Sequence, residues 1–316
     1  MTDIKIAFNA FRSGLGPNGG SRTILKSAEV LREIGYKVDV IASVDNFNWF
    51  DHIAPVTYFS NDIDILINVA AVDYNITARS KAPIKAAWWR AHEDWSNSED
   101  YLKAVYLDDT VRNIVNSNGL KQLLSVYGAD SDVIYQGVDF DWWENRALRK
   151  DGVIRIGCLY TKQPRKRWQD FVKLHALLGE DGYEYISIGS AEPPDNFLKR
   201  SWVNVDHDEL CTAYSSCDIW FAPTESEGLH NVPIEANLCG CLVVCADEPL
   251  NGMIYDYAFN ENTAMVYDRK DINHAAELIK NPNWKLVVRM QKYIKENIGS
   301  RETNMKKLVE LLENNI

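Results

Sequence analysis

Short apolar runs rich in β-branched and aromatic residues alternate with helical patterns along most of the chain. The alternation opens with "IKIAFNAF" at 4–11, continues through a glycine-containing segment into a helical pattern at 21–34, and reaches a second apolar run, "YKVDVIAS", at 36–43. A strand, a helix and a strand in this order form a βαβ unit, and such units build parallel sheets that helices cover. The pattern therefore predicts an α/β protein.

The alternation fills two successive halves. In the first half, further strand and helix patterns lie at 63–70, 84–89, 99–106, 112–118, 119–127 and 131–137. In the second half they lie at 153–159, 168–178, 183–189, 202–206, 208–216, 218–223, 233–239 and 241–247, before helical stretches at 272–297 and 301–316.

A chain of 316 residues exceeds the size at which one hydrophobic core keeps growing. We therefore predict two doubly wound parallel-sheet domains, residues 1–138 and 153–300. The segment 139–152 has mixed charge and weak periodicity, and it is expected to be the linker. In such sheets ligands bind beyond the carboxyl ends of the strands, so two such edges are expected to face one another across a cleft.

The composition excludes several classes of function. A formal net charge of −11 disfavours nucleic acid as the main partner, because phosphate binding depends on a basic surface. No apolar run approaches the length of a membrane-spanning helix, and the N-terminus lacks the pattern of a signal peptide, which predicts a cytoplasmic protein. The six cysteines lie among apolar neighbours without metal-site spacing, and are expected to be reduced core residues.

The segment "TESEGLHNVPIEANLCG", at 224–240, carries two glutamates around a loop. Glu227 and Gly228 follow the apolar run "DIWFAP", and Pro233 is expected to start a helix with Glu235 in its first turn. Unpaired N–H groups at a helix start can bind an anion. Taken singly, Glu235 is equally consistent with a helix-capping acid, and Glu227 with a solvated loop residue.

Here the chain resembles the family-4 retaining glycosyltransferases of GT-B fold, whose domains are Rossmann-like. "TESEGLHNVPIEANLCGCLVV" is similar to the family's signature of two glutamates separated by seven residues and followed by an apolar strand. "GPNGGSRTILKSAEVLREIGYKVDVIA", "VIYQGVDFDWW" and "IGCLYTKQPRKRWQDFVKLHALL" resemble further family segments in the same order. The resemblance implies that the helix at 301–316 packs back on the first domain.

The resemblance also implies an activity. A sugar would move from a nucleoside-diphosphate sugar, with UDP or GDP as the expected nucleotide, to an acceptor hydroxyl with retained configuration. The acceptor would be a glycan, a lipid-linked molecule or a small molecule, so transient contact with a membrane is compatible with it. The family uses side-chain cations and a helix dipole instead of a metal ion, so no metal and no other cofactor are expected.

The basic cluster "KQPRKR", at 162–167, is the densest in this acidic chain. Lys166 matches the family lysine that receives the departing diphosphate. The family's companion arginine would stand one residue after the strand glycine, but Cys158 occupies that position. Arg165 and Lys162, from the same loop, are the two candidates to replace it.

The same resemblance assigns the remaining residues of the site. Glu235 would accept hydrogen bonds from the donor ribose, and Glu227 would face the donor sugar. His92, in "AWWRAHEDW", would lie near the donor sugar and the acceptor, although a structural histidine is an equal alternative. The backbone of two glycine-containing loops would hold sugar or phosphate: Gly228, Leu229, His230 and Asn231 in one, Gly19 and Gly20 in the other.

Three rival functions remain. A nicotinamide-dependent oxidoreductase would need G-x-G-x-x-G directly after a strand, and "GLGPNGGS" has a different glycine spacing. A nucleotide-sugar epimerase of GT-B fold would share the architecture but not the loop of two glutamates. A GT-B protein that binds a nucleotide sugar without transferring it is the non-enzyme alternative, and Cys158 and His230, which stands where the family often has glycine, keep it open.

Overall fold

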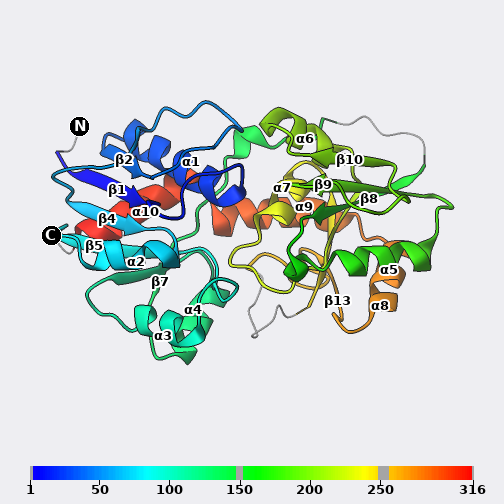
Figure 1. Ribbon diagram of the computed structural model, residues 1–316. Coiled ribbons are helices and arrows are strands. Elements are labelled where there is room, and N and C mark those ends of the chain that lie inside the picture. The colour runs from blue at the N-terminus through cyan, green and yellow to red at the C-terminus, as the bar shows by residue number, and fades with distance from the viewer. Residues whose placement is uncertain (1–2, 147–151, 248–255, 315–316) are drawn as a thin grey trace. The chain divides into compact units, whose positions relative to one another are not determined.

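The computed structural model describes residues 3–146, 152–247 and 256–314, and within it the chain divides into two compact units (Figure 1). The N-terminal unit comprises the chain up to Val138 and again from Gly299 onward, and the C-terminal unit comprises Asp139–Ile298. Residues 147–151 of the predicted linker lie outside the described residues.

The N-terminal unit is built on a parallel sheet of seven strands, in the order β3-β2-β1-β4-β5-β6-β7. The order reverses beside β1, which is the doubly wound topology that the alternating pattern predicts. The strands are β1 (Lys5–Asn9), β2 (Lys37–Ile41), β3 (Val56–Thr57), β4 (Ile65–Asn68), β5 (Ile84–Trp89), β6 (Arg112–Val115) and β7 (Asp132–Val133).

Helices cover both faces of this sheet. On one face α1 (Gly19–Glu33) and α10 (Arg301–Glu313) pack against alternate strand residues such as Phe8 and Ile67, and Leu308 of α10 is fully buried there. On the other face α2 (Tyr74–Ala78) and α3 (Glu99–Tyr106) lie over Trp89, whose ring contacts Tyr74 and Tyr106. The remaining helix is α4 (Asn118–Val126).

The C-terminal segment returns to the N-terminal unit at Gly137. This glycine has φ +69°, and a Cβ built on it would lie 2.4 Å from the Cα of Arg301, so only glycine fits there. The N–H of Val138 donates to the carbonyl of Gly299 at 3.1 Å, and the N–H of Arg301 donates to the carbonyl of Val138 at 3.2 Å. This crossing places α10 on α1 and completes the core (Figure 1).

The C-terminal unit repeats the architecture with six parallel strands in the order β10-β9-β8-β11-β12-β13. The strands are β8 (Ile154–Tyr160), β9 (Tyr183–Gly189), β10 (Arg200–Val203), β11 (Ile219–Ala222), β12 (Leu242–Ala246) and β13 (Met265–Tyr267). The helices are α5 (Trp168–Leu178), α6 (His207–Ser215), α7 (Asn231–Leu238), α8 (Ile272–Lys280) and α9 (Lys285–Tyr293). All six cysteines are buried free thiols, as predicted.

Two details differ from the sequence prediction. The helical stretch at 272–297 is two helices, because "NPNW" after Lys280 interrupts it and proline disfavours a helical conformation in the residue before it. The strands β3 and β13 were not predicted, since each is only two or three residues long.

Candidate functional site

Two loops of the C-terminal unit, residues 161–167 and 223–230, follow neighbouring strands. β8 and β11 pair in parallel, so both loops leave the sheet at the same edge. The backbone joins them directly, because the N–H of Glu225 donates to the carbonyl of Arg165 at 2.9 Å. The fold therefore brings the basic cluster and the first of the two glutamates together.

The basic loop is held by Arg167. This residue adopts the left-handed conformation, φ 56° and ψ 40°, between the 3-10 turn Pro164–Lys166 and α5. The conformation costs a non-glycine residue about 1–2 kcal/mol. Two ion pairs offset that cost: Nη1 of Arg167 donates to Oε1 of Glu225 at 2.7 Å, and Nε donates to Asp170 at 2.9 Å. Arg167 therefore fixes the loop, whereas Lys162 is exposed.

Glu227 lies at the centre of the cluster. Its Oε1 accepts a hydrogen bond from Nζ of Lys166, and its Oε2 lies 3.9 Å from Nη1 of Arg165, which also donates to the carbonyl of Ser226 at 2.9 Å. The side chains of Lys166 and Glu227 are only 10% and 13% exposed. Arg165, not Lys162, is therefore the cation that stands beside Lys166.

The electrostatics keep Glu227 ionised. Burial alone would raise the pKa of this carboxyl, but the positive charges of Lys166 and Arg165 outweigh burial and lower the pKa to about 2. A carboxylate held between cations in a largely buried position remains negative throughout the physiological pH range. The loop therefore presents one fixed anion between two cations.

His230 is buried and neutral. Its side chain is 3% exposed, and Nε2 lies 3.9 Å from Oε1 of Glu227. Burial lowers the pKa of His230 to about 3, despite the attraction of Glu227, and the nearby Lys166 and Arg165 lower it further. Its carbonyl accepts a hydrogen bond from the hydroxyl of Tyr257 at 2.7 Å, which fixes the residue at the start of α7.

The buried neutral state of His230 has a consequence for stability. Below about pH 6.5 the unfolded chain binds a proton on this residue, whereas the folded chain does not until about pH 3, so the free energy of unfolding falls as the pH falls through this window. Between pH 7 and pH 5 we expect wild type to lose about 2 kcal/mol more than His230→Gln, which cannot titrate there. Denaturant unfolding of both proteins at pH 7 and pH 5 measures these losses. Equal losses of unfolding free energy in wild type and His230→Gln would contradict the neutral state of His230.

The helix after the loop begins earlier than predicted. α7 starts at Asn231, not at Pro233, so Glu235 lies beyond the first turn instead of inside it. Proline is compatible with this start, because the first N–H groups of a helix have no partner within the helix. The positive end of α7 therefore lies directly after Gly228 and Leu229, both of which are buried.

Glu235 lies in a different environment from Glu227. It is 6% exposed, and its Oε2 accepts a hydrogen bond from the hydroxyl of Tyr214 on α6 at 3.3 Å. The ring of Tyr214 in turn packs edge-on against Trp220 of β11 and contacts Trp143. The sequence prediction missed Tyr214, although it falls in the segment leading into the motif.

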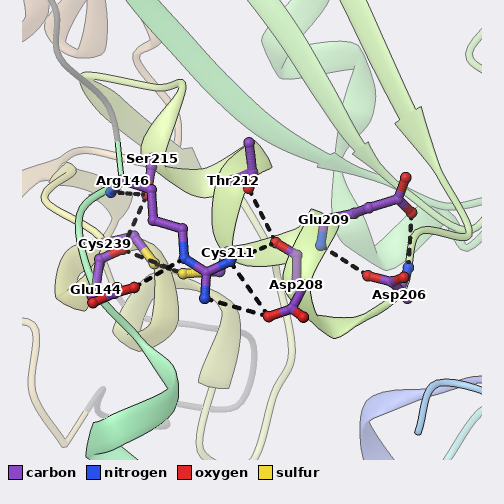
Figure 2. A network of polar contacts seen from close by, with 9 residues as sticks. All are labelled: Glu144, Arg146, Asp206, Asp208, Glu209, Cys211, Thr212, Ser215 and Cys239. Atoms are coloured by element: carbon purple, nitrogen blue, oxygen red, sulfur yellow. Dashed lines mark hydrogen bonds and ion pairs between the residues drawn. The ribbon is translucent and has the colours of Figure 1, made fainter.

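A polar network joins α6 to the segment after Asp139 and to the end of α7 (Figure 2). Arg146 pairs with Glu144 at 3.2 Å and with Asp208 of α6 at 3.3 Å. The sulfur of Cys211 donates to the carbonyl of Glu144 at 3.3 Å and lies 3.6 Å from the sulfur of Cys239, the C-cap of α7. These contacts fix the two helices that carry Tyr214 and Glu235.

The sequence analysis placed Gly19 and Gly20 in a loop of the N-terminal unit. In the structure they are instead the first residues of α1. Asn18 is the reason: its side chain caps the helix by accepting from the N–H of Ser21 at 2.9 Å, which moves the helix start forward. Arg90, which follows β5, donates to the carbonyl of Gly20 at 2.6 Å and holds this turn. Burial lowers the pKa of Arg90 to about 10, so it remains charged at neutral pH.

His92 is buried in a side-chain cluster. It is 3% exposed, Nδ1 lies 3.1 Å from the hydroxyl of Tyr106, Nε2 lies 3.3 Å from Glu99, and the ring stacks on Tyr127. These contacts match the structural alternative, and a role in the reaction stays a prediction. The next residue, Glu93, was missed: it accepts the N–H of Ala71 at 3.1 Å, and burial raises its pKa.

Cys158 is fully buried in the core of the C-terminal unit, so its side chain cannot replace the cation that the family arginine provides.

Within the described residues, no three His, Cys, Asp or Glu side chains lie close enough together to form a metal site. In the same residues, no helix combines the length and the apolar character needed to cross a membrane.

No protein-family model matches the chain, and no curated protein matches its sequence. Solved structures do match. Sucrose-phosphate synthase from Thermosynechococcus elongatus superimposes with a TM-score of 0.79 at 15% identity, covering 99% of both chains. The Anabaena protein HepE, in complex with UDP and glucose, has a TM-score of 0.79 at 15% identity, covering 98% of this chain and 100% of its own. The chain has the GT-B fold. The lipopolysaccharide outer core galactosyltransferase WaaB shares this fold with a TM-score of 0.67 at 13% identity, covering 98% of this chain and 99% of its own.

Proposed function

We propose that this GT-B chain is a retaining glycosyltransferase of family 4 that moves a sugar from a nucleoside-diphosphate sugar to an acceptor hydroxyl without a metal ion. The observation that carries the proposal is the cluster of Lys166, Arg165 and Glu227 at the carboxyl ends of β8 and β11. It lies where doubly wound sheets bind ligands, and the N-terminus of α7 follows it directly.

The two cations receive the charge of the departing diphosphate. Lys166 has three N–H donors, and Glu227 occupies one of them, so the others serve phosphate oxygens. Arg165 is fixed by its bond to the carbonyl of Ser226 and adds a second positive group. Donors placed where negative charge develops lower the barrier most, because they need no rearrangement during the reaction.

Glu227 stabilises the positive charge that develops on the donor sugar. As the bond to the anomeric carbon breaks, the sugar gains oxocarbenium character, and a nearby carboxylate stabilises that positive charge. The pKa of about 2 keeps Glu227 ionised for this task. Glu235 binds the ribose hydroxyls, and the backbone from Gly228 to Asn231 holds the sugar and the phosphate.

In the N-terminal unit the first turn of α1 is the backbone segment that would hold a phosphate or sugar group. Gly19 has no heavy atom within 4 Å of a Cβ built on it, so the backbone there is open to a ligand. Arg90 positions this turn through the carbonyl of Gly20. His92 contacts the substrates only if its cluster with Tyr106 and Glu99 rearranges.

The identity of the nucleotide is the first question for experiment. HepE was solved with UDP and glucose, and an α-glucosyltransferase with a TM-score of 0.66 was solved with UDP. A UDP sugar is therefore the first donor to test, followed by GDP and ADP sugars.

Release of nucleoside diphosphate from a panel of UDP, GDP and ADP sugars, in buffer with EDTA, tests the proposal. We expect slow release from one nucleotide class without any acceptor, because an intact transferase hydrolyses its donor. Binding without release would assign a nucleotide-sugar-binding protein, and release only after addition of a divalent metal would contradict the metal-free mechanism.

A further inference from the structure

An aromatic segment follows β2 in the N-terminal unit and ends in two exposed rings. Tyr58 and Phe59, directly after β3, are each 70% exposed. Soluble proteins seldom leave adjacent aromatic side chains so open without a use for them. Neither ring belongs to the donor site described above.

The rest of the segment is anchored. Phe47 and Phe50 pack against the core of the unit and against each other, with ring centroids 4.7 Å apart. The amine of Lys26, on α1, lies 4.2 Å from the ring of Phe50. Tyr58 itself rests edge-on against Phe11, with ring centroids 4.9 Å apart and an interplanar angle of 75°. Tyr58 is therefore held by its contact with Phe11, and the segment before it is held by the packed rings of Phe47 and Phe50.

The order and direction of β1, β2 and β3 place the rings of Phe11 and Tyr58 at one edge of the sheet. β1, β2 and β3 are parallel neighbours, and Phe11 and Tyr58 each follow the carboxyl end of one of them. Backbone bonds link the three ends: the N–H of Ser43 donates to the carbonyl of Phe11 at 3.0 Å, and the N–H of Ala42 donates to that of Thr57 at 2.9 Å. The first turn of α1 leaves the same edge, so the rings lie on the ligand-binding side of the unit.

The local charge favours a neutral, hydroxylated ligand over a membrane. Residues 43–64 contain four aspartates and neither lysine nor arginine. Anionic lipid surfaces attract basic segments and repel acidic ones. A sugar, by contrast, carries no net charge and offers an apolar C–H face to an aromatic ring.

We propose that Phe11, Tyr58 and Phe59 form a stacking platform for a saccharide, and that the acceptor of the transfer reaction is a carbohydrate. The identification of the ligand as the acceptor rests on the proposed function. The platform binds the sugar unit that bears the acceptor hydroxyl, or the unit next to it, at the carboxyl edge of the N-terminal sheet.

Saturation-transfer NMR tests this platform directly. The probes are a panel of neutral mono- and disaccharides and their alkyl glycosides, each added to the protein saturated with UDP. We expect signals from at least one saccharide with wild type, and at least a tenfold loss of its affinity in Tyr58→Ala/Phe59→Ala. Val126→Ala is the matched control, because Val126 is 81% exposed on the same unit, outside the platform. Both variants should keep the melting temperature of wild type, since the altered side chains are exposed.

Three results would overturn the platform. The first is no signal from any saccharide with wild type, and the second is equal signals from wild type and the double variant. The third is that wild type binds phosphatidylglycerol vesicles and the double variant loses this binding while it keeps its affinity for saccharides. Donor hydrolysis is the separate readout for the proposed function. A wild-type protein that hydrolyses its donor but gives no signal from any saccharide disproves the platform alone.

Discussion

Lys166→Ala is expected to lower the rate constant for nucleoside-diphosphate release by two to three orders of magnitude. The variant removes a donor from the point where the leaving diphosphate gains charge, and a single such donor is worth about 3–4 kcal/mol in the transition state. Steady-state release of nucleoside diphosphate measures the change. Lys199→Ala is the control that removes the same charge. The side chain of Lys199 is 67% exposed in the same unit, and its amine pairs with Glu184 at 3.5 Å instead of with the cluster.

The ion pair with Glu227 complicates this variant, because losing Lys166 leaves a largely buried carboxylate without its closest cation. Lys166→Met/Glu227→Gln removes both charges and therefore separates the two effects. If the loss of activity reflected only the stranded carboxylate, the double variant would recover. We expect no recovery, because both groups act on the reaction itself.

Glu235→Ala is expected to abolish the rise in melting temperature that a nucleoside diphosphate causes in wild type. A ligand at 100 times its dissociation constant stabilises the folded state by about 2.7 kcal/mol, so the shift in wild type is easily measured. Without the carboxylate the ribose hydroxyls lose their acceptor, and a buried hydroxyl pair without partners binds poorly. Thermal denaturation with UDP, GDP and ADP, in EDTA, measures the effect.

Two controls separate binding from folding in this experiment. Glu277→Ala removes an exposed acid from α8 and should leave the nucleotide shift intact. Glu235→Gln keeps an oxygen acceptor for the hydroxyl of Tyr214, so its ligand-free melting temperature should match wild type more closely than that of Glu235→Ala. A full nucleotide shift in Glu235→Ala would remove this residue from the binding site.

Most of the architecture could be predicted from the sequence, because the alternation of strand and helix patterns determines a parallel sheet. Besides the two short strands and the break within 272–297, what failed were the ends of elements. α1 and α7 both begin two residues before the predicted start, at Gly19 and Asn231, because glycine and proline are acceptable where a helix does not use its N–H groups. Asn18, whose side chain caps α1, was a sequence signal for the first of these starts, whereas His230 makes no side-chain cap and the start of α7 had no such signal.

The contacts within the site could not be predicted in the same way. Lys166 and Glu227 are 61 positions apart, and they meet only because β8 lies beside β11 in the sheet, a strand order that local patterns do not specify. The pairing of Arg167 with Glu225 has the same cause. Arg90 and Glu93 were missed because nothing in "WWRAHEDW" distinguishes them from His92, whereas the fold buries the histidine among tyrosines.

A crystal structure of the protein grown with a nucleoside diphosphate in EDTA is the most direct measurement. We predict that the phosphate groups contact Lys166 and the backbone at the start of α7, and that the ribose contacts Glu235. Nucleotide bound elsewhere in the chain, or bound only through a divalent ion, would contradict the proposed mechanism.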